Sequence, residues 1–247
     1  MRLGGKVAIV TGGARHIGAV YARKLAAEGA AVVIADILDG SEIRSQIETA
    51  GGQAIALTVD VSSEQDTLRM AAEAIKAFGR IDILVNNAAI FINLKRKPFE
   101  EITAEEWDQV SAVNIKGPFL CAKAVFPQMK RQQSGKIINI SSSTAFAGTP
   151  FFLHYVASKA ALIGMTRSLA REAGDHGICV NAIAPGLVQH EGQNAPKEFT
   201  EFQLKARALK RLQTPEDLLG ALIYLASPDS DFVTGQTLMI DGGSILH

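Results

Sequence analysis

The chain of 247 residues is long enough for one α/β domain or two smaller ones, and its 47% hydrophobic content with 22 glycines suits a globular protein with a sizeable core. Its 25 Lys and Arg residues balance its 25 Asp and Glu residues, so no net field favours nucleic acid or an anionic membrane as a partner. The basic run at residues 95–97 is more typical of a solvated loop than of a binding site. The first 13 residues lack a long apolar segment and no apolar run is long enough to span a bilayer, so we expect a cytoplasmic protein with reduced, buried Cys121 and Cys179.

The first predicted elements surround a glycine-rich turn. Residues 6–11 form a β-branched run typical of a strand, and helical spacing follows over residues 17–28. Between them stands T-G-G-A-R-H-I-G, residues 11–18. Glycines in such a turn let the backbone approach a pyrophosphate, while the helix N-terminus offers unpaired N–H groups. The turn alone is a weak signal, but its place between a strand and a helix favours a nucleotide site.

The next predicted strand, residues 31–36, is a continuous apolar run that ends on Asp36. This carboxylate lies roughly 20 residues past the glycine turn, where it could accept hydrogen bonds from an adenosine ribose and would repel a 2′-phosphate. A helix-capping or turn role is the alternative for Asp36. Arg15 favours the opposite cofactor, because a guanidinium could pair with a 2′-phosphate, but Ile37 adds no positive charge to support it. The sequence therefore favours NAD over NADP.

The alternation of strands and helices continues to the end of the chain. Further strands are predicted over residues 53–59, 81–85, 136–140, 178–183 and 236–240, and helices over residues 63–78, 104–129, 155–173 and 215–226. This alternation predicts a doubly wound α/β fold in which residues 1–247 form one domain around a parallel sheet. Residues 187–214 are mixed in character and too long for a simple connection, so we expect a substrate-binding lid there.

Polar residues follow several of the predicted strands. Tyr155 and Lys159 stand one helical turn apart, so an ammonium could stabilise a phenolate on the same face. A free phenol has a pKa of about 10, and such a neighbour would bring it toward a working pH near neutrality. The pair alone is a common coincidence on solvated helices. Residues 86–89, N-N-A-A, suit close packing on a flat ligand. A lone Asn114 in a helix is by itself more typical of a surface residue or of one that bonds to the local backbone.

Taken together, these motifs carry more information than any one of them. The chain resembles the short-chain dehydrogenase/reductase family over essentially its whole length, because it contains, in order, T-G-G-A-R-H-I-G, Asp60, N-N-A-A, Asn114, Ser142, Y-V-A-S-K, P-G and T-G-Q-T-L-M-I-D-G-G. The resemblance implies a single Rossmann-like domain with a seven-stranded parallel sheet, usually assembled as a homotetramer. It also implies a nicotinamide cofactor.

The resemblance supplies roles for four catalytic residues. Tyr155 is similar to the family's acid-base catalyst, and Ser142 to the residue that holds the substrate oxygen. Lys159 would lower the tyrosine pKa and bind the nicotinamide ribose. Asn114 would support a water chain that carries the proton to solvent. Serines flank Ser142 on both sides, and the family's spacing to Tyr155 favours the middle one.

The resemblance also implies which residues surround the cofactor, from the pyrophosphate to the nicotinamide: Gly12, Arg15, Ile17, Gly18, Asp36, Asp60, Val61, Asn87, Ala88, Ala89, Tyr155, Lys159, Pro185, Gly186 and Val188. Two positions depart from the family pattern. His16 replaces the middle glycine of the first turn, and we expect the backbone to keep its geometry with the imidazole pointing outward. His190 replaces a threonine that often contacts the carboxamide, which alters the nicotinamide side of the site.

The predicted function is an NAD-dependent dehydrogenase that interconverts a secondary alcohol and a ketone. Several apolar residues flank the expected substrate position and favour an apolar, aromatic or cyclic substrate, although core or interface roles explain them equally well: Phe91, Phe146, Phe151, Phe152 and Leu153. Of these, Phe146 and Phe152 are predicted to contact the substrate beside Ser142 and Tyr155. The sequences H-Y-V-A-S-K and M-I-D-G-G-S-I-L-H resemble those of bacterial family members that oxidise aryl or ring-bearing alcohols.

Two other functions remain open. The nearest rival is an NADP-dependent 3-oxoacyl carrier-protein reductase, which Asp36 disfavours. A non-catalytic NAD-binding regulatory protein is the rival from another class, and the complete set of four catalytic residues disfavours it. No metal site is expected, because the five histidines show no ligand spacing.

Overall fold

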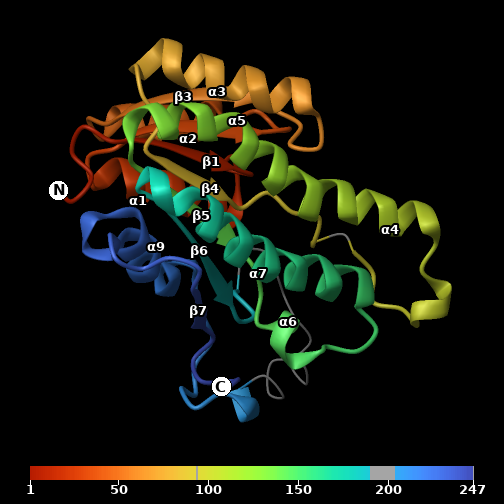
Figure 1. Ribbon diagram of the computed structural model, residues 1–247. Coiled ribbons are helices and arrows are strands. Elements are labelled where there is room, and N and C mark those ends of the chain that lie inside the picture. Colours follow the sequence, from red (N-terminus) through yellow and green to blue (C-terminus); the bar gives the residue numbers. More distant parts are fainter. Residues whose placement is uncertain (93, 190–203, 247) are drawn as a thin grey trace.

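Seven parallel strands form one sheet in the order β3-β2-β1-β4-β5-β6-β7 (Figure 1). The computed structural model describes residues 1–92, 94–189 and 204–246. The sheet confirms the predicted α/β fold with seven parallel strands. The strands are β1 (Val7–Thr11), β2 (Ala31–Asp36), β3 (Gln53–Thr58), β4 (Ile83–Asn86), β5 (Gly135–Ile140), β6 (Ile178–Pro185) and β7 (Thr237–Ile240).

The strand order reverses between β1 and β4, in the middle of the sheet. Val10 of β1 pairs with Ile34 of β2 on one side and with Val85 of β4 on the other. In open α/β sheets the crevice outside the carboxyl ends of such strands is where ligands bind. The topology therefore points to the ends of β1 and β4 as the place to look for a site.

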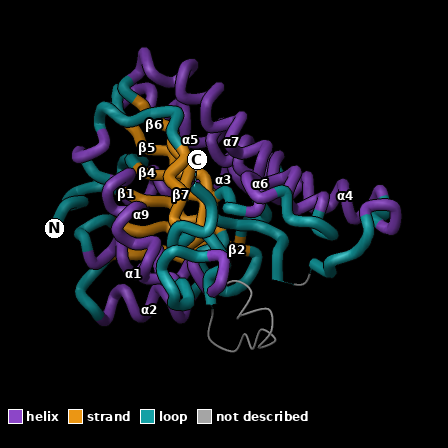
Figure 2. Tube along the Cα trace, turned by 90° about the horizontal axis from the view of Figure 1, so that it is seen from below, coloured by secondary structure: helices purple, strands orange, loops and turns teal. Residues whose placement is uncertain are grey.

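Helices cover both faces of the sheet (Figure 2). One face carries α1 (His16–Ala27), α2 (Ser41–Thr49) and α9 (Leu219–Ala226), and the other carries α3 (Glu64–Phe78), α5 (Gly117–Gln132) and α7 (Leu153–Ala173). Each face has its own core of fully buried side chains, with Tyr21 and Leu25 on the first and Met70 and Met129 on the second. Burial on both faces explains why the strands are continuous apolar runs in the sequence.

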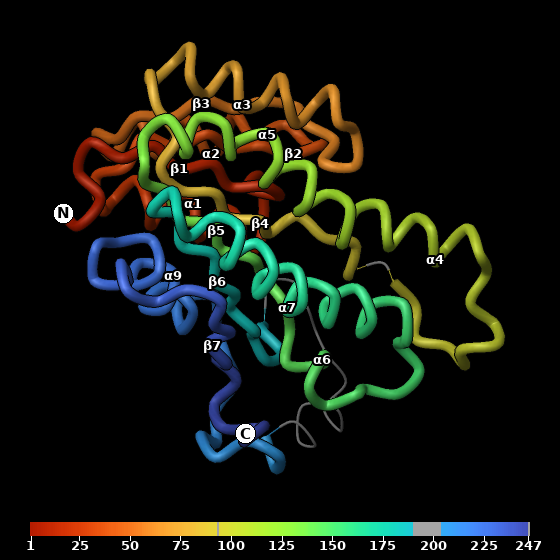
Figure 3. Tube along the Cα trace, viewed as in Figure 1, coloured from red at the N-terminus to blue at the C-terminus, as the bar shows by residue number. Residues whose placement is uncertain are grey.

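The structure corrects two details of the predicted helices. The sequence analysis missed α2, because only Ile43 and Ile47 of its nine residues are buried and the rest of the segment is polar. The single helix predicted over residues 104–129 was wrong: it consists of α4 (Ala104–Ser111), a π-helical turn (Ala112–Lys116) and α5, which follow one another along one path (Figure 3). Such π-turns inside helices often mark functional positions.

The segment predicted as a lid is described only at its two ends. Val188 forms a parallel bridge with Gln213, and the backbone N–H of Gln189 donates to the carbonyl of Gln213 at 2.8 Å. The buried Arg207 donates to the carbonyl of Leu187 at 2.7 Å. The rest of the predicted lid, including His190, lies outside the described residues. Among the helices that the structure describes, none has the length and apolar character needed to cross a membrane.

Candidate active site

A cavity of about 1380 Å³ lies at the carboxyl ends of the central strands. Its wall includes the residues that directly follow β1, β2, β4, β5 and β6, where the reversal of strand order opens the sheet. Every residue predicted to surround the cofactor lines this one cavity: Gly12, Arg15, Ile17, Gly18, Asp36, Asp60, Val61, Asn87, Ala88, Ala89, Tyr155, Lys159, Pro185, Gly186 and Val188.

The glycine turn after β1 is held by hydrogen bonds from the end of β4. The Asn87 amide donates to the carbonyls of Thr11 at 2.9 Å and Gly12 at 3.1 Å, and the Thr11 hydroxyl accepts from the backbone N–H groups of Asn87 and Ala88. A Cβ on Gly12, where φ is 63°, would lie 2.9 Å from the Cα of Ala88. A Cβ on Gly18 would overlap the carbonyl oxygen of Gly12. The turn therefore leaves bare backbone at the cavity wall, as a pyrophosphate site requires.

His16 occupies the position of the middle glycine in the family pattern of this turn. Its φ of 51° is in the left-handed region, and its side chain is exposed at the cavity edge. A non-glycine residue in this conformation costs about 1–2 kcal/mol. Burial of part of the ring and the charge of Arg15 both lower the pKa of the imidazole. The backbone thus keeps a glycine-like geometry with the side chain directed outward.

Asp36 ends β2 and is 8% exposed. One carboxylate oxygen accepts from the backbone N–H of Ala14 at 3.0 Å, and the other accepts from the N–H of Leu38 at 3.0 Å. The first bond ties the carboxylate to the glycine turn, while the side chain still lines the cavity. The turn role and the ribose role considered for Asp36 are therefore compatible, because a carboxylate can accept about four hydrogen bonds.

Tyr155 projects from the start of α7 and is 7% exposed. Its hydroxyl faces that of Ser142, and this interaction favours ionisation of the phenol. Ser142 Oγ also accepts from the backbone N–H of Thr144 at 3.2 Å and from the hydroxyl of Thr144 at 3.0 Å. The neighbouring Ser141 instead donates its hydroxyl to the carbonyl of Lys159 at 2.8 Å. Of these two serines, Ser142 is the one whose hydroxyl faces the tyrosine.

Burial controls the ionisation of Tyr155 and Lys159. It raises the pKa of the Tyr155 phenol, and the hydrogen bond with Ser142 acts in the opposite direction. Burial lowers the pKa of the Lys159 ammonium to about 8. The ammonium donates to the carbonyl of Ile140 at 2.7 Å and lies 5.7 Å from the centre of the Tyr155 ring. Lys159 is not among the groups that lower the pKa of Tyr155 in the protein alone, and the desolvation of the buried phenol raises that pKa.

Asn114 sits in the π-helical turn and is fully buried. Its side chain accepts from the backbone N–H of Ile90 at 2.8 Å, and it donates to the carbonyl of Ile90 at 3.2 Å and to the hydroxyl of Ser158 at 3.1 Å. These bonds tie the chain beyond β4 to α7, one residue before Lys159. The surface role considered for a lone helical asparagine is thus wrong, and the bonds bring Asn114 behind the cavity wall.

Aromatic rings form a wall beside Tyr155. The Phe152 ring stacks on the Tyr155 ring with centroids 4.8 Å apart, and the Phe91 ring lies 5.0 Å from it. Both phenylalanines line the cavity. Phe146 is half-buried on α6 (Thr144–Ala147) and does not belong to the described lining. Phe151 is 60% exposed and also lies outside that lining.

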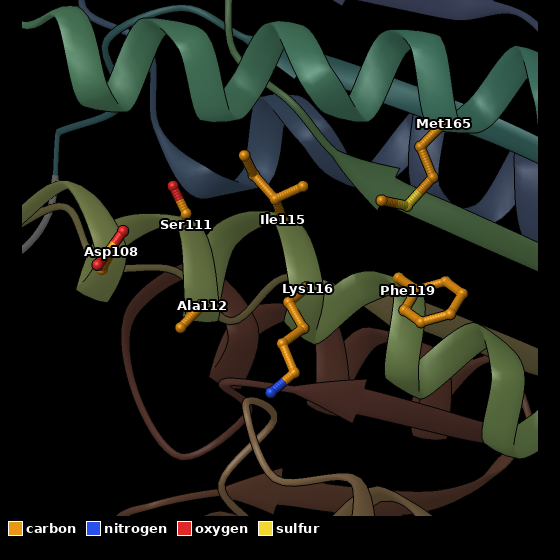
Figure 4. Close-up of a pocket in the computed structure, with 7 residues that line it drawn as sticks. All are labelled: Asp108, Ser111, Ala112, Ile115, Lys116, Phe119 and Met165. Carbon is orange, nitrogen blue, oxygen red and sulfur yellow. The ribbon is translucent and has the colours of Figure 1, made fainter.

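A second, shallower hollow of about 540 Å³ lies on the outer side of α4, α5 and α7 (Figure 4). Met165 of α7 points toward the helix that carries Ile115 and Phe119, and Phe119 is 46% exposed. The side chains of this hollow include no histidine, cysteine or tyrosine, so it is a weaker candidate for catalysis than the large cavity: Asp108, Ser111, Ala112, Ile115, Lys116, Phe119 and Met165.

Comparisons with known proteins agree with this geometry. A family model described as enoyl-(acyl carrier protein) reductase matches residues 12–244. Galactitol 2-dehydrogenase from Agrobacterium fabrum is 40% identical over 99% of both chains, and a 3-oxoacyl-[acyl-carrier-protein] reductase from Staphylococcus epidermidis is 38% identical over 96% of this chain and 98% of its own. A crystal structure assigned to a short-chain alcohol dehydrogenase from Sinorhizobium meliloti superposes with a TM-score of 0.93 at 34% identity, covering 98% of this chain and 97% of the other.

The chain belongs to the short-chain dehydrogenase/reductase family. It is therefore an oxidoreductase of that family, and the family uses nicotinamide cofactors. The named relatives act on different kinds of compound, a sugar alcohol in one case and an acyl carrier-protein ester in another. Membership alone thus does not choose a substrate or a cofactor for this short-chain dehydrogenase/reductase.

Some residues of the site were missed by sequence reasoning. Thr11 anchors the glycine turn, and its position directly before two glycines was the available signal. Ser158 bonds Asn114 and lies inside the Y-V-A-S-K motif. Lys95 and Arg96 line the cavity, although their run of charge was interpreted as a solvated loop; both are indeed exposed as well. Within the described residues, no cluster of three or more His, Cys, Asp or Glu side chains could hold a metal ion.

Proposed function

We propose that this protein is an NAD-dependent dehydrogenase that interconverts a secondary alcohol and a ketone. The observation that carries the proposal is that Tyr155, Ser142 and Lys159 line one cavity, which also contains the glycine turn and Asp36. Positioned hydroxyl donors of this kind are worth a few kcal/mol when charge develops on a substrate oxygen.

The cavity fits a dinucleotide. Bare backbone at Gly12 and Gly18 allows a pyrophosphate to approach, and Asp36 stands at the adenosine end with lone pairs left to accept from a ribose. Asp60 and Val61 would border the adenine, and the nicotinamide would lie against the segment that follows β6: Pro185, Gly186 and Val188. When bound, the nicotinamide supplies the hydride acceptor or donor. Asp36 would repel a 2′-phosphate, which favours NAD, although the exposed Arg15 could pair with such a phosphate.

The protein's own residues would handle the proton and the substrate oxygen. Tyr155 takes the alcohol proton during oxidation and returns it during reduction. Ser142 donates to the substrate oxygen and holds it beside the phenol. The Lys159 ammonium, 5.7 Å from the centre of the Tyr155 ring, would stabilise the phenolate form of Tyr155 when it forms during the reaction. Asn114 would support the water chain that returns the proton to solvent, a role that stays a prediction.

The aromatic wall favours an apolar substrate with a ring. Phe152 is buried and Phe91 half-buried, and both flank the tyrosine where a substrate oxygen would bind. Such a wall can hold a flat ring by stacking. The predicted contact with Phe146 stays a prediction, as does the closing of residues 187–214 over the substrate as a lid.

Further expectations belong to the same proposal. We propose that residues 1–247 act as one domain in the cytoplasm on a small molecule. We also propose a homotetramer, which the mostly apolar hollow that contains the exposed Phe119 supports, because contiguous exposed apolar surface often marks subunit contacts. Sedimentation analysis of the purified protein tests the assembly, and a monomer at micromolar concentration would exclude it.

One rival function keeps support from the comparisons. The Staphylococcus epidermidis relative is a 3-oxoacyl carrier-protein reductase, so an NADP-dependent reductase of that kind is the second candidate. Asp36 disfavours it. A non-catalytic NAD-binding regulatory protein is disfavoured by the four residues Asn114, Ser142, Tyr155 and Lys159.

A panel of cyclic and aryl secondary alcohols, assayed with NAD by the absorbance of NADH, tests the proposed reaction. We expect turnover of ring-bearing alcohols such as 1-phenylethanol and loss of that turnover in Tyr155→Phe. Tight NADH binding without oxidation of any alcohol in the panel, together with an unchanged Tyr155→Phe variant, would instead favour the regulatory protein.

A further inference from the structure

Three consecutive basic residues, Lys95, Arg96 and Lys97, line the cavity. They lie at its substrate end, the end that contains Phe91, Phe152 and Tyr155. They follow the aromatic residue Phe91 in the segment between β4 and α4. Lys95 and Arg96 are exposed, and Lys97 is partly buried. Apart from the catalytic Lys159, the only other charged side chain of the described lining at this end is Glu106. This end of the described wall therefore carries a net positive charge, unlike the chain as a whole.

Glu106 compensates one of these charges, that of Lys97. Its two oxygens each accept from the Lys97 ammonium at 2.7 Å. One of them also accepts from the backbone N–H of Thr103, which starts α4 with a capping box. Lys95 forms no ion pair with any carboxylate among the described residues. The positive charge of Lys95 therefore remains available to a ligand.

Arg96 connects this charge to the catalytic tyrosine through a stack of rings. Its guanidinium carbon lies 5.3 Å from the centre of the Phe152 ring, and that ring lies 4.8 Å from the Tyr155 ring. The sum of these two distances is an upper limit on the distance from the guanidinium carbon to the centre of the Tyr155 ring. The Tyr155 hydroxyl lies beyond the ring centre, and a benzene ring with a carboxylate and a ketone at opposite ends, hydrogen-bonded at each end, is of comparable length. The stacking also orients the planar guanidinium, which binds carboxylates in a bidentate way.

We infer that the preferred substrate is a compact hydroxy acid or keto acid, whose carboxylate binds Arg96 and Lys95 while its alcohol or ketone lies at Tyr155. The inference rests on the proposed function and changes its apolar, ring-bearing substrate into one that also carries a carboxylate. It distinguishes a compact acid from an acyl thioester, because a phosphopantetheine arm would carry its phosphate far beyond the reach of Arg96 from the reacting carbonyl.

A matched pair of ketones tests the inference by binding alone. In the presence of NAD a ketone cannot be reduced, so calorimetry measures equilibrium affinity for 4-acetylbenzoate and for its methyl ester. We expect the acid to bind about five- to tenfold more tightly than the ester, as for a partly exposed ion pair. Arg96→Gln should remove this preference and leave the ester's affinity within twofold of the wild type. Added salt should weaken the acid and not the ester.

The control is Arg44→Gln, which removes another exposed arginine from α2, where it pairs with Glu48 at 3.7 Å. It should leave both affinities unchanged. Three results would overturn the inference. The wild type could bind acid and ester with equal affinity, Arg96→Gln could weaken the binding of both ligands alike, or neither ketone could bind. Failure of the proposed function has a different signature, the absence of alcohol oxidation with NAD across the panel, which the binding experiment does not depend on.

Discussion

The two ends of the cavity differ in whether backbone or side chains form the wall. At the adenosine end the wall is mainly backbone, and Asn87 and Asp36 hold the glycine turn by hydrogen bonds to main-chain atoms. At the substrate end the wall consists of side chains, namely Phe91, Phe152 and Arg96. A backbone wall follows from the fold itself, whereas a side-chain wall changes with each substitution. This difference explains why family members can share a cofactor site while their named substrates range from a sugar alcohol to an acyl carrier-protein ester.

The largest loss of activity is expected from a substitution at Tyr155, which lies where the cofactor and substrate ends of the cavity meet. Tyr155→Phe removes the acid-base hydroxyl, so kcat for alcohol oxidation should fall about 10³-fold or more. The affinity for NAD should hardly change, because the backbone end of the cavity is untouched. Steady-state kinetics and calorimetry measure the two quantities separately.

The matched control for this variant is Tyr224→Phe, in α9 and outside the cavity lining. It should retain wild-type kcat. If Tyr155→Phe kept more than a tenth of the activity, the assignment of Tyr155 as the acid-base group would be wrong.

Ser142→Ala should give the next largest effect, a fall in kcat of about 10²-fold to 10³-fold. It should also shift the pH profile. The hydrogen bond with Ser142 lowers the pKa of Tyr155, so its loss raises that pKa. Oxidation requires the phenolate, and its rate should therefore rise at higher pH in the variant than in the wild type. Rate measurements between pH 6 and 10 check the direction, and a shift to lower pH would contradict it.

Gly18→Ala tests the backbone end of the cavity. The added Cβ would overlap the carbonyl oxygen of Gly12 and approach Asn87 Nδ2 to 2.7 Å, so the turn must move. We expect a loss of about 1–3 kcal/mol in the free energy of unfolding and weaker NAD binding. Gly164→Ala is the control, because its Cβ would meet nothing within 4 Å on α7. It should stabilise the protein by about 0.5–1 kcal/mol. Equal effects of the two substitutions on NAD binding would refute the role of the turn.

The smallest effect concerns His16. Replacing it by glycine relieves the left-handed conformation at φ 51° but adds backbone entropy to the unfolded chain. The net result should be a gain of about 0.5–1 kcal/mol in the free energy of unfolding, with NAD affinity unchanged within about threefold. Thermal unfolding with and without NAD measures both. A large loss of NAD affinity would mean that the imidazole itself binds the cofactor.

The backbone end could be predicted from the sequence and the substrate end could not, for physical reasons. Gly12, Gly18 and Asp36 follow strands that are recognisable as apolar runs, so their positions on the sheet edge follow from the topology alone. The contact between Arg96 and Phe152 joins two segments more than 50 residues apart, and no local pattern encodes it. The π-helical turn at Asn114 also escaped prediction, because helical spacing continues across it.

The ratio of kcat/KM for NAD to that for NADP tests the account most directly, because it measures whether Asp36 at the adenosine end of the cavity selects the cofactor without a 2′-phosphate. Asp36, held against the glycine turn, should repel the 2′-phosphate of NADP. We predict a preference for NAD of about tenfold or more, the size expected when a carboxylate faces a phosphate at a partly buried site. A strong preference for NADP, measured with the same alcohol, would contradict the account and favour the carrier-protein reductase.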